Sequence, residues 1–449
     1  MDQTTVIEPF LGQVRAAGAA LDALHIVALG VFTLLVQAGF ATLDTGLVRS
    51  KNVAHTTAMV LLASCAGLVG FWSVGFGLQN GFHGFFFDPS KVGVAVVVVF
   101  LSRTGLAVVS TTIPAGAAAE RSRLTSTVFL SFILAALIFP TYSQWVWGGG
   151  WLSRLHLGHG VVDCSGSGVV HMTGGMVALV SARMLGPRLG KYTLRGDVRP
   201  IPAHNMPMVV LGTLLLSAGW VGLATTSCTR HAGSMVAALA VNALLASAAG
   251  ALWAFAHTRL RFGKPDLSMI CNGLLAGLVA ISAAGGFVGG GSAIVIGAGA
   301  SLLTLEGALF IERRLRIDDP VGAGAVHGIS GAWGLLAVGI FANGRAGDGW
   351  NGFAGPVRGL LAGSGGQLLA SVIGIAANVL WVVPSSAVVL WIIGRLVSGR
   401  VVADDEVAGL DVPELGMTGY VSEAVHAGAT RGGDLGHGKM SASRTSVTG

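Results

Sequence analysis

The chain alternates between long apolar stretches and short polar ones along most of its 449 residues. A helix needs roughly 17–25 mostly apolar residues to cross a bilayer, and about eleven stretches meet this requirement. The pattern predicts an all-α integral membrane protein with spans near residues 24–43, 58–78, 92–119, 124–147, 167–184, 206–226, 233–257, 269–287, 293–310, 322–341 and 368–394. The glycine-rich stretch 285–291 leaves one alternative open, in which the eighth and ninth spans form a single broken segment.

Basic residues lie mainly in alternate loops. Lys and Arg gather near 49–51, 121–123, 183–199, 259–264, 313–316 and 395–400, whereas the loops on the opposite side carry few. Because basic loops remain on the cytoplasmic side, this asymmetry predicts a multi-pass protein of the cell membrane. It places an N-terminal segment (1–23) outside, a transmembrane domain at 24–400 and a cytoplasmic tail at 401–449, with disorder after 426.

Composition supports the membrane interpretation. The chain is 53% hydrophobic and 11% charged, whereas soluble proteins carry about 25% charged residues. Its 69 glycines suit a bilayer, where small residues let helices approach closely. The net charge of +6 is spread between apolar segments, so neither a nucleic-acid partner nor a cofactor is predicted. Cys164 and Cys228 both fall near outer helix ends, which is compatible with free thiols or with a disulfide.

The two halves of the domain, about 24–190 and 200–345, echo each other. Each carries a histidine on its fifth helix, His171 in one half and His327 in the other. Five is an odd number, so the second half enters the membrane from the opposite side. The sequence therefore predicts two inverted five-helix repeats, a common transporter plan with the site at the repeat interface, and one additional helix at about 368–394.

His171 and His327 are the sharpest candidates for function. An ionisable side chain inside a span costs free energy and usually faces a pathway or a partner. Two unrelated, hydrogen-bonded core histidines are the alternative, and the matched placement favours the pathway. A metal site is less favoured, because zinc normally takes three or four ligands and no third ligand is predictable at this depth. The sequence offers no nucleophile–base pair that would indicate an enzyme.

Two further features lie near the outer end of the fourth and fifth spans. The tryptophans of the run 144–151 suit an interfacial aromatic belt, or one of them, Trp147, offers its ring face to a cation. Asp163 precedes His171 by eight residues. This carboxylate is a candidate either for capping the following helix or for organising a cation site.

Taken in order, the motifs resemble those of the ammonium transporter and Rhesus-protein family, from the first span to Tyr420. The segments that carry the resemblance are 44–52 (Asp-Thr-Gly-Leu-Val-Arg-Ser-Lys-Asn), 116–121, 145–151, 163–171, 204–207, 219–222, 264–265, 318–320 and 326–328. The resemblance implies a homotrimer in the lipid bilayer, with one narrow hydrophobic pore in each subunit. It implies that ammonium binds at an outer site and loses a proton, and that ammonia then passes two facing histidines. A cytoplasmic nitrogen-signalling regulator, docking on loops and the C-terminal tail, is a candidate partner.

On this resemblance, Trp147 and Ser227 match outer-site positions, Asp163 matches the carboxylate that organises the site, and His171 and His327 match the pore pair. The sequence departs from the family in the tail, where the family's His-Gly-Glu reads Leu-Gly-Met at 415–417, and at four positions within the spans. Leucine replaces the phenylalanine expected at two gate positions, serine replaces a third aromatic residue, and arginine replaces a neutral glutamine; these residues are Leu106, Leu223, Ser102 and Arg103.

Arg103 has two interpretations. Its head group either reaches the lipid headgroups or a subunit contact, or it faces the outer vestibule and repels ammonium. The function predicted from the sequence is ammonium/ammonia transport with a weakened outer site. The alternative is a transport-impaired sensor or docking protein, or a pore for another small solute, on the same scaffold.

Overall fold

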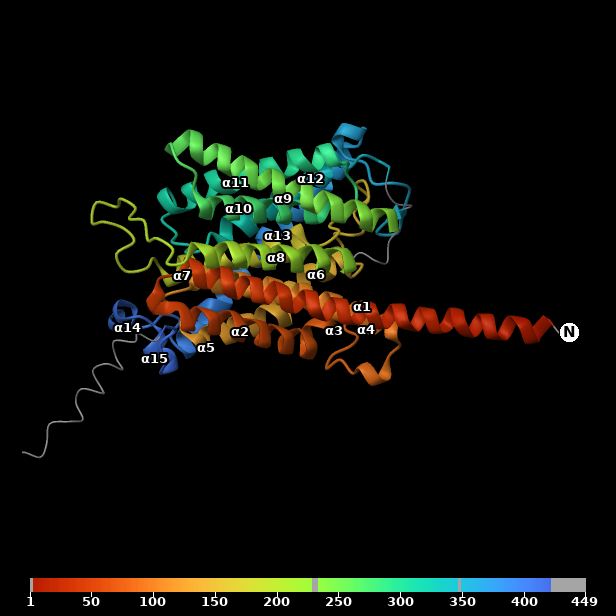
Figure 1. The fold of residues 1–449 in the computed structure, drawn as a ribbon, viewed down its shortest axis with the longest axis horizontal. Helices are drawn as coiled ribbons and strands as arrows, with labels where there is room; N and C mark the ends of the chain where they lie inside the picture. Colours follow the sequence, from red (N-terminus) through yellow and green to blue (C-terminus); the bar gives the residue numbers. More distant parts are fainter. Residues whose placement is uncertain (1–2, 228–232, 346–348, 421–449) are drawn as a thin grey trace, which may run out of the picture.

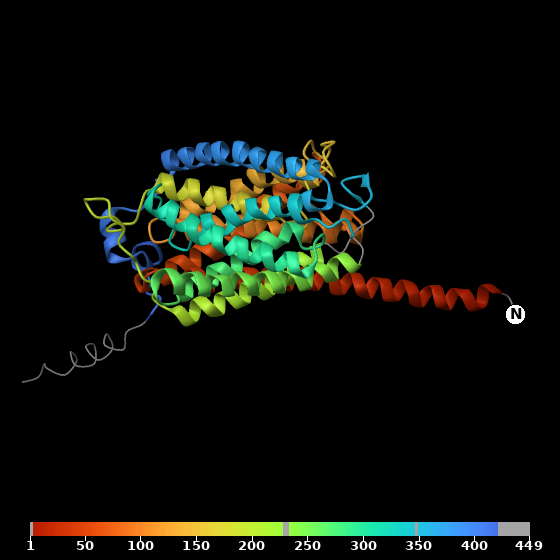
Figure 2. The same ribbon diagram turned by 90° about the horizontal axis from the view of Figure 1, so that it is seen from above.

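The computed structural model describes residues 3–227, 233–345 and 349–420. Among these residues, eleven helices are long and apolar enough to cross a membrane. They lie side by side in one bundle (Figures 1 and 2). The predicted all-α membrane fold with about eleven spans is therefore confirmed. The tail predicted to be disordered after 426 lies outside the described residues, as does Cys228.

The first half of the chain supplies five spans. Its elements are α1 (Gln3–Leu47), η1 (Ser50–Asn52), α2 (Val53–Gly70), η2 (Phe71–Gly75), α3 (Phe76–Gln79), η3 (Pro89–Lys91), α4 (Val94–Ala118), α5 (Leu124–Ile133), η4 (Leu134–Ile138), α6 (Phe139–Trp147), η5 (Ser167–Met172) and α7 (Thr173–Leu185). The first helix begins well before the predicted start of its span at 24, and its N-terminal part extends beyond the bundle (Figure 1). Alanine is the best helix former, and the alanine-rich stretch 16–23 lets the helix continue.

The second half supplies six spans, including the additional one. Its elements are α8 (Met206–Ser227), α9 (Gly233–Phe262), α10 (Leu267–Ala284), α11 (Gly290–Arg313), η6 (Gly324–Ile329), α12 (Ser330–Phe341), β1 (Gly349–Trp350), β2 (Phe353–Ala354), η7 (Leu360–Ala362), α13 (Gly365–Leu396), α14 (Ala403–Ala408) and α15 (Asp411–Leu415). The two short strands pair antiparallel. The glycine-rich stretch 285–291 contains the break between α10 and α11, so the eighth and ninth spans are separate helices.

The first helices of the two halves, α1 and α8, pack directly against each other. A Cβ atom on Gly39 would lie 2.4 Å from the backbone nitrogen of Leu216, and one on Gly212 would lie 2.3 Å from that of Leu43. Side chains cannot approach a backbone this closely, so both positions require glycine. Close packing of this kind holds helices together inside a bilayer, where no hydrophobic force does so.

The bundle has two distinct ends. The N-terminal part of α1 projects from one end, here called the N-terminal side, and α14 and α15 lie at the other, the C-terminal side (Figure 1). The short C-terminal helices are docked at the start of α2. The side chain of Asp411 accepts a hydrogen bond from the backbone of His55, and that of Asn52 accepts one from Leu410, each at 2.9 Å.

A buried ion pair links the two halves on the C-terminal side, and another ion pair lies within the first half. Arg188 donates to both carboxylate oxygens of Asp318, at 2.8 and 2.9 Å, and Arg49 donates to Glu120 at 2.6 Å. Burial by itself would raise the pKa of Asp318. The hydrogen bonds and charge of Arg188 outweigh burial and hold that pKa at about 2. The loops at this end are thus fixed by paired charges.

Candidate functional site

The two predicted histidines lie against each other near the middle of the bundle. The Nδ1 atoms of His171 and His327 are 3.3 Å apart, and the ring centroids are 5.3 Å apart with an angle of 25° between the planes. Both residues are buried. Each lies in a π-helical turn, His171 in η5 and His327 in η6, and π-helical turns are frequent at functional sites. A Cβ on Gly175 of α7 would lie 2.2 Å from the nitrogen of Gly328 in η6, so glycine allows α7 and η6 to meet beside the histidines.

Aromatic rings hold the histidines in place. Trp220 stacks on His171 with centroids 3.8 Å apart and planes 16° apart, and Phe40 contacts His327 at 5.9 Å. The indole N–H of Trp220 is satisfied by the hydroxyl of Ser282 at 3.0 Å. The imidazoles are therefore fixed by packing from α8 and α1, which are the paired first helices of the two halves.

Small cavities adjoin the histidine pair on both sides. The cavity next to His171 has a volume of about 10 Å³ and is lined by Val36, Leu106, Val109, Ser165, His171, Trp220, Leu223 and Ala224. The cavity next to His327 also has about 10 Å³ and is lined by Phe40, Leu43, Asp44, Ile113, Asn272, Leu275, Val321, Ala323, Val326 and His327. A volume of this order admits about one water-sized molecule. Both linings are mostly apolar.

A much larger cavity, of about 740 Å³, lies on the C-terminal side of this pair of small cavities. It shares Asn272 and Val321 with the cavity next to His327. Charged groups, including Lys264 and Glu312, line it. Two small apolar cavities at the histidines thus lie next to a wide cavity that has charged groups on its wall, and the term pore below refers to these three cavities together.

Asp163 caps the segment that carries His171. One carboxylate oxygen accepts from the backbone nitrogens of Gly166 and Ser167, at 2.8 and 2.9 Å, and the other accepts from Gly168 and Val169, both at 2.9 Å. The side chain is fully buried. Of the two interpretations from the sequence, the structure thus places this carboxylate as a helix cap. Its backbone oxygen also accepts from the indole N–H of Trp147, at 2.7 Å.

Arg103 lies over the face of Trp147. Its guanidinium carbon is 4.1 Å from the centroid of the indole ring, which is a close cation–π contact. Both side chains are partly buried. The gate position Leu106 lies one turn further along α4, and Leu223 faces it across the cavity next to His171. Arg103 therefore lies on the N-terminal side of the cavity next to His171, in contact with Trp147.

The remaining predicted residues are less informative. Ser102 is buried and lines none of the cavities described above. Ser227 ends α8, but its side chain lies outside the described part of the chain. Within residues 3–227, 233–345 and 349–420, no three His, Cys, Asp or Glu side chains are grouped closely enough to hold a metal ion.

Sequence reasoning missed several residues that line the pore. Trp220 and Asp44 were each part of a quoted motif, 219–222 and 44–52, without an assigned role. Ser165 was likewise part of a quoted motif, 163–171, without an assigned role, whereas Asn272 was not singled out. A signal was present for Asp44, because an acidic residue near the end of an apolar span is costly unless it serves a purpose. Asn272 gave no comparable signal, since neutral amides are tolerated at helix interfaces.

Comparison with known proteins decides the family. The Ammonium Transporter Family pattern matches residues 24–420. The chain belongs to the ammonium transporter family. It is 39% identical over 405 residues to "Ammonium transporter Amt2" of Archaeoglobus fulgidus, covering 87% of this chain and 86% of that protein. It is 34% identical to "Ammonium transporter Amt1" of Haloferax mediterranei, covering 91% and 80%.

Solved structures of the ammonium transporter family share the fold. The structure described as "Sensor Amt Protein" matches with a TM-score of 0.80 and 30% identity, covering 88% of this chain and 98% of that one. Mep2 of Candida albicans matches with a TM-score of 0.75 and 26% identity, covering 85% and 87%. The chain is thus a multi-pass membrane protein of a transporter family, not of an enzyme family.

Proposed function

We propose that this protein conducts ammonium nitrogen across the cell membrane as neutral ammonia, past His171 and His327. The observation that supports this most is the stacked histidine pair, with a one-molecule apolar cavity on each side. A bare cation in such a passage would lose its hydration without compensation. Ammonia fits because it is uncharged, and the imidazole nitrogens can replace its lost hydrogen bonds with water.

The proposal includes the orientation and the assembly. The basic loops support a C-terminal side that faces the cytoplasm, with the N-terminal part of α1 outside. Family membership supports a homotrimer with one pore in each subunit. The 740 Å³ vestibule is then the cytoplasmic exit, and a cytoplasmic nitrogen-signalling regulator would meet the loops and the docked C-terminal helices beside it.

A weakened outer cation site is the second part of the proposal. The guanidinium of Arg103 already covers a face of Trp147 that a substrate cation would need. A second positive charge about 8 Å away would be repelled by roughly 2 kcal/mol at an effective dielectric constant of about 20. Leu106 and Leu223 add no ring face, so the cation–π attraction of roughly 0.5–2 kcal/mol per ring is missing as well.

A sensor is the second candidate function. It is favoured by the occupied face of Trp147 and by the match to a structure described as "Sensor Amt Protein". A sensor of this kind would respond to ammonium without appreciable flux. A pore for another small solute is the third candidate, and it would conduct that solute but not ammonia.

Transport by the purified full chain in liposomes tests the proposal. When ammonium is added outside the liposomes, ammonia that enters takes up protons and should raise the internal pH. An internal pH dye should report this rise at a rate far above that of liposomes without protein. His171→Ala should change that rate strongly, because the side chain adjoins one of the passage cavities. His156→Ala is the matched control, since His156 is exposed in a loop on the N-terminal side. No alkalinisation by the parent chain would favour the sensor or the other-solute function.

A further inference from the structure

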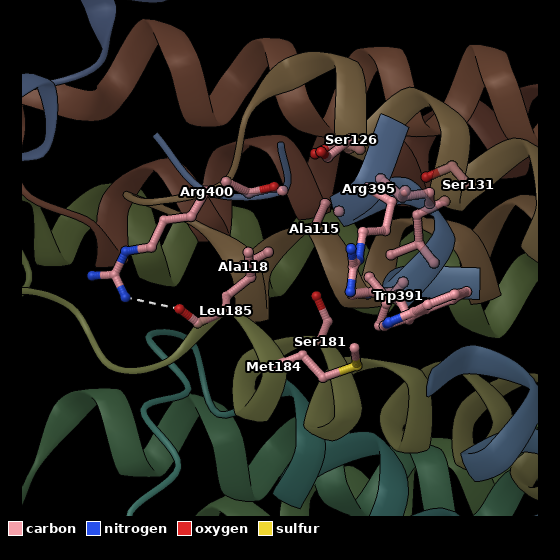
Figure 3. Close-up of a pocket in the computed structure, with 18 residues that line it drawn as sticks. Ala115, Ala118, Ser126, Ser131, Ser181, Met184, Leu185, Trp391, Arg395 and Arg400 are labelled. Carbon is pink, nitrogen blue, oxygen red and sulfur yellow. Dashed lines mark hydrogen bonds between the residues drawn. The ribbon is translucent and has the colours of Figure 1, made fainter. Parts of the chain in front are cut away.

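A second cavity, of about 280 Å³, lies outside the pore on the C-terminal side. It is formed where α4, α7 and α13 end and α5 begins, and Figure 3 shows side chains of these helices around it. It shares no lining residue with the three pore cavities. Helix α13 runs along an outer edge of the bundle (Figure 2), so the cavity belongs to the periphery and not to the pore.

The deep part of this cavity is apolar. Leu130 and Leu390 line it, six residues from the start of α5 and from the end of α13, respectively. At 1.5 Å per residue, these leucines lie about 9 Å from the helix ends. Ala115 and Ala118 of α4 complete the wall, and their small side chains leave room. This depth and lining suit a hydrocarbon chain.

The rim of the cavity is basic and hydroxylic. Arg400 is neutralised by Glu406 at 2.7 Å and donates to the backbone oxygen of Leu185 at 2.8 Å (Figure 3). Arg395 differs, because no carboxylate of the described residues pairs with it, and its guanidinium carbon lies 5.5 Å from the ring centroid of Trp391. Five hydroxyl side chains line the same cavity. Those of Ser122, Ser126, Thr127 and Ser181 lie nearer the rim, and that of Ser131 lies beside Leu130 in the otherwise apolar deep part.

We propose that this cavity binds an anionic phospholipid, with its phosphate at Arg395 and the hydroxyl groups and an acyl chain against the leucines. The planar guanidinium matches phosphate oxygens through paired hydrogen bonds. Basic pockets between membrane helices bind acidic lipid head groups, and tryptophan is enriched at this interfacial depth. The apolar deep part of the cavity favours a lipid over free phosphate, because inorganic phosphate would contact only the rim.

A bound lipid would tie the end of α13 to α4 and α5. Helix α13 leads directly to Arg400, whose pairing with Glu406 anchors α14. The lipid would therefore stabilise the attachment of the C-terminal helices to the bundle. This inference does not depend on which solute crosses the pore, so it stands or falls separately from the proposed function.

Native mass spectrometry and thermal unfolding of the full chain in detergent test the site. Phosphatidylglycerol should be retained more than phosphatidylcholine with the same acyl chains, and it should raise the midpoint of unfolding further. Arg395→Gln should weaken phosphatidylglycerol binding on the order of tenfold, as expected for loss of a charge-assisted hydrogen bond. It should weaken phosphatidylcholine binding less, because the cationic choline group already offsets the charge of that lipid's phosphate. Arg259→Gln is the matched control, since Arg259 is an exposed arginine near the end of α9 on the same side, away from this cavity.

A second variant tests the apolar part. Ala118→Leu places a larger side chain in the cavity and should reduce binding of both lipids, while gel filtration reports whether the fold is kept. Equal loss of phosphatidylglycerol in Arg395→Gln and Arg259→Gln, or no preference for phosphatidylglycerol in the parent, would overturn the site. If inorganic phosphate alone raised the unfolding midpoint as much as the lipid does, the ligand would be a free anion and the lipid proposal would be wrong.

Discussion

At the centre of the pore, two stacked imidazoles lie between mostly apolar cavities, and aromatic rings of the protein flank them. At the N-terminal-side entrance, by contrast, the aromatic face of Trp147 is covered by a permanent cation, Arg103, at 4.1 Å. The centre is equipped to pass a small neutral molecule. On the N-terminal side, the ring face that the proposed cation site would use is already in contact with Arg103.

This difference separates two tasks that a transporter of ammonium nitrogen must combine. Conduction needs the passage, and capture at low concentration needs a cation site. Under the proposed function the passage is kept and the cation site is altered, so we expect a rate that follows the concentration of ammonia and shows little saturation with ammonium. Each of the following predictions concerns a variant that alters the entrance alone, the centre alone, or the residue that connects them.

The largest effect is expected at Asp163, which serves both regions. Its carboxylate accepts four backbone hydrogen bonds at the start of η5, and its backbone oxygen holds the indole of Trp147. Asp163→Asn replaces one acceptor oxygen by an amide donor that faces backbone N–H groups. Leaving buried donors unsatisfied costs about 1–3 kcal/mol each, so η5 should lose its cap, conduction should fall by at least tenfold, and the thermal midpoint should drop.

The control for this prediction is Asp88→Asn. Asp88 also caps a short helix, η3, but it is partly exposed and lies outside the pore. This variant should keep both conduction and the thermal midpoint near those of the parent. If Asp163→Asn behaved like Asp88→Asn, the cap would not connect the entrance to the centre as argued here.

The second effect concerns the entrance alone. Arg103→Gln frees the face of Trp147, and a cation–π contact of about 0.5–2 kcal/mol corresponds to a gain of about two- to thirtyfold in apparent ammonium affinity. Transport should become saturable, as measured by initial rates over a range of ammonium concentrations. Arg103→Lys keeps the charge and should resemble the parent. A gain in both variants would point to packing and not to charge.

The sequence predicted the features that depend on local patterns better than those that depend on contacts between distant helices. Bilayer thickness sets span length and basic loops indicate orientation, so the eleven spans followed from a local pattern. The histidine pair was found because it recurs at the same place in both halves. The orientation of Arg103 remained open, because its partner lies on another helix, 44 positions along the chain. The π-helical turns of η5 and η6 also left no sequence signal, since they depend on how α7 and α12 pack.

The third effect concerns the end of the pore on the C-terminal side. Asp44 is buried and lines the cavity next to His327, and its carboxyl group can accept a proton from, or return one to, a molecule leaving the histidines. An asparagine amide cannot take up that proton, so Asp44→Asn should lower ammonium-evoked current on a solid-supported membrane, by less than the change expected for Arg103→Gln. Lumenal alkalinisation by ammonia should change less. Equal losses in both measurements would indicate a blocked passage instead of altered proton transfer.

The smallest effect is expected from restoring two phenylalanines, Leu106→Phe with Leu223→Phe. Two rings would add a cation–π attraction of roughly 0.5–2 kcal/mol each for a cation above them. However, both leucines are buried around a cavity of only about 10 Å³, and overpacking of this kind costs about 1–3 kcal/mol. The two terms nearly cancel, so ammonium-dependent transport should change by less than about threefold while Arg103 is present. Adding Arg103→Gln should reveal the attraction, because the rings then face a substrate cation with no competing guanidinium. If the double variant alone matched the gain of Arg103→Gln, the missing rings and not the arginine would be what limits the entrance.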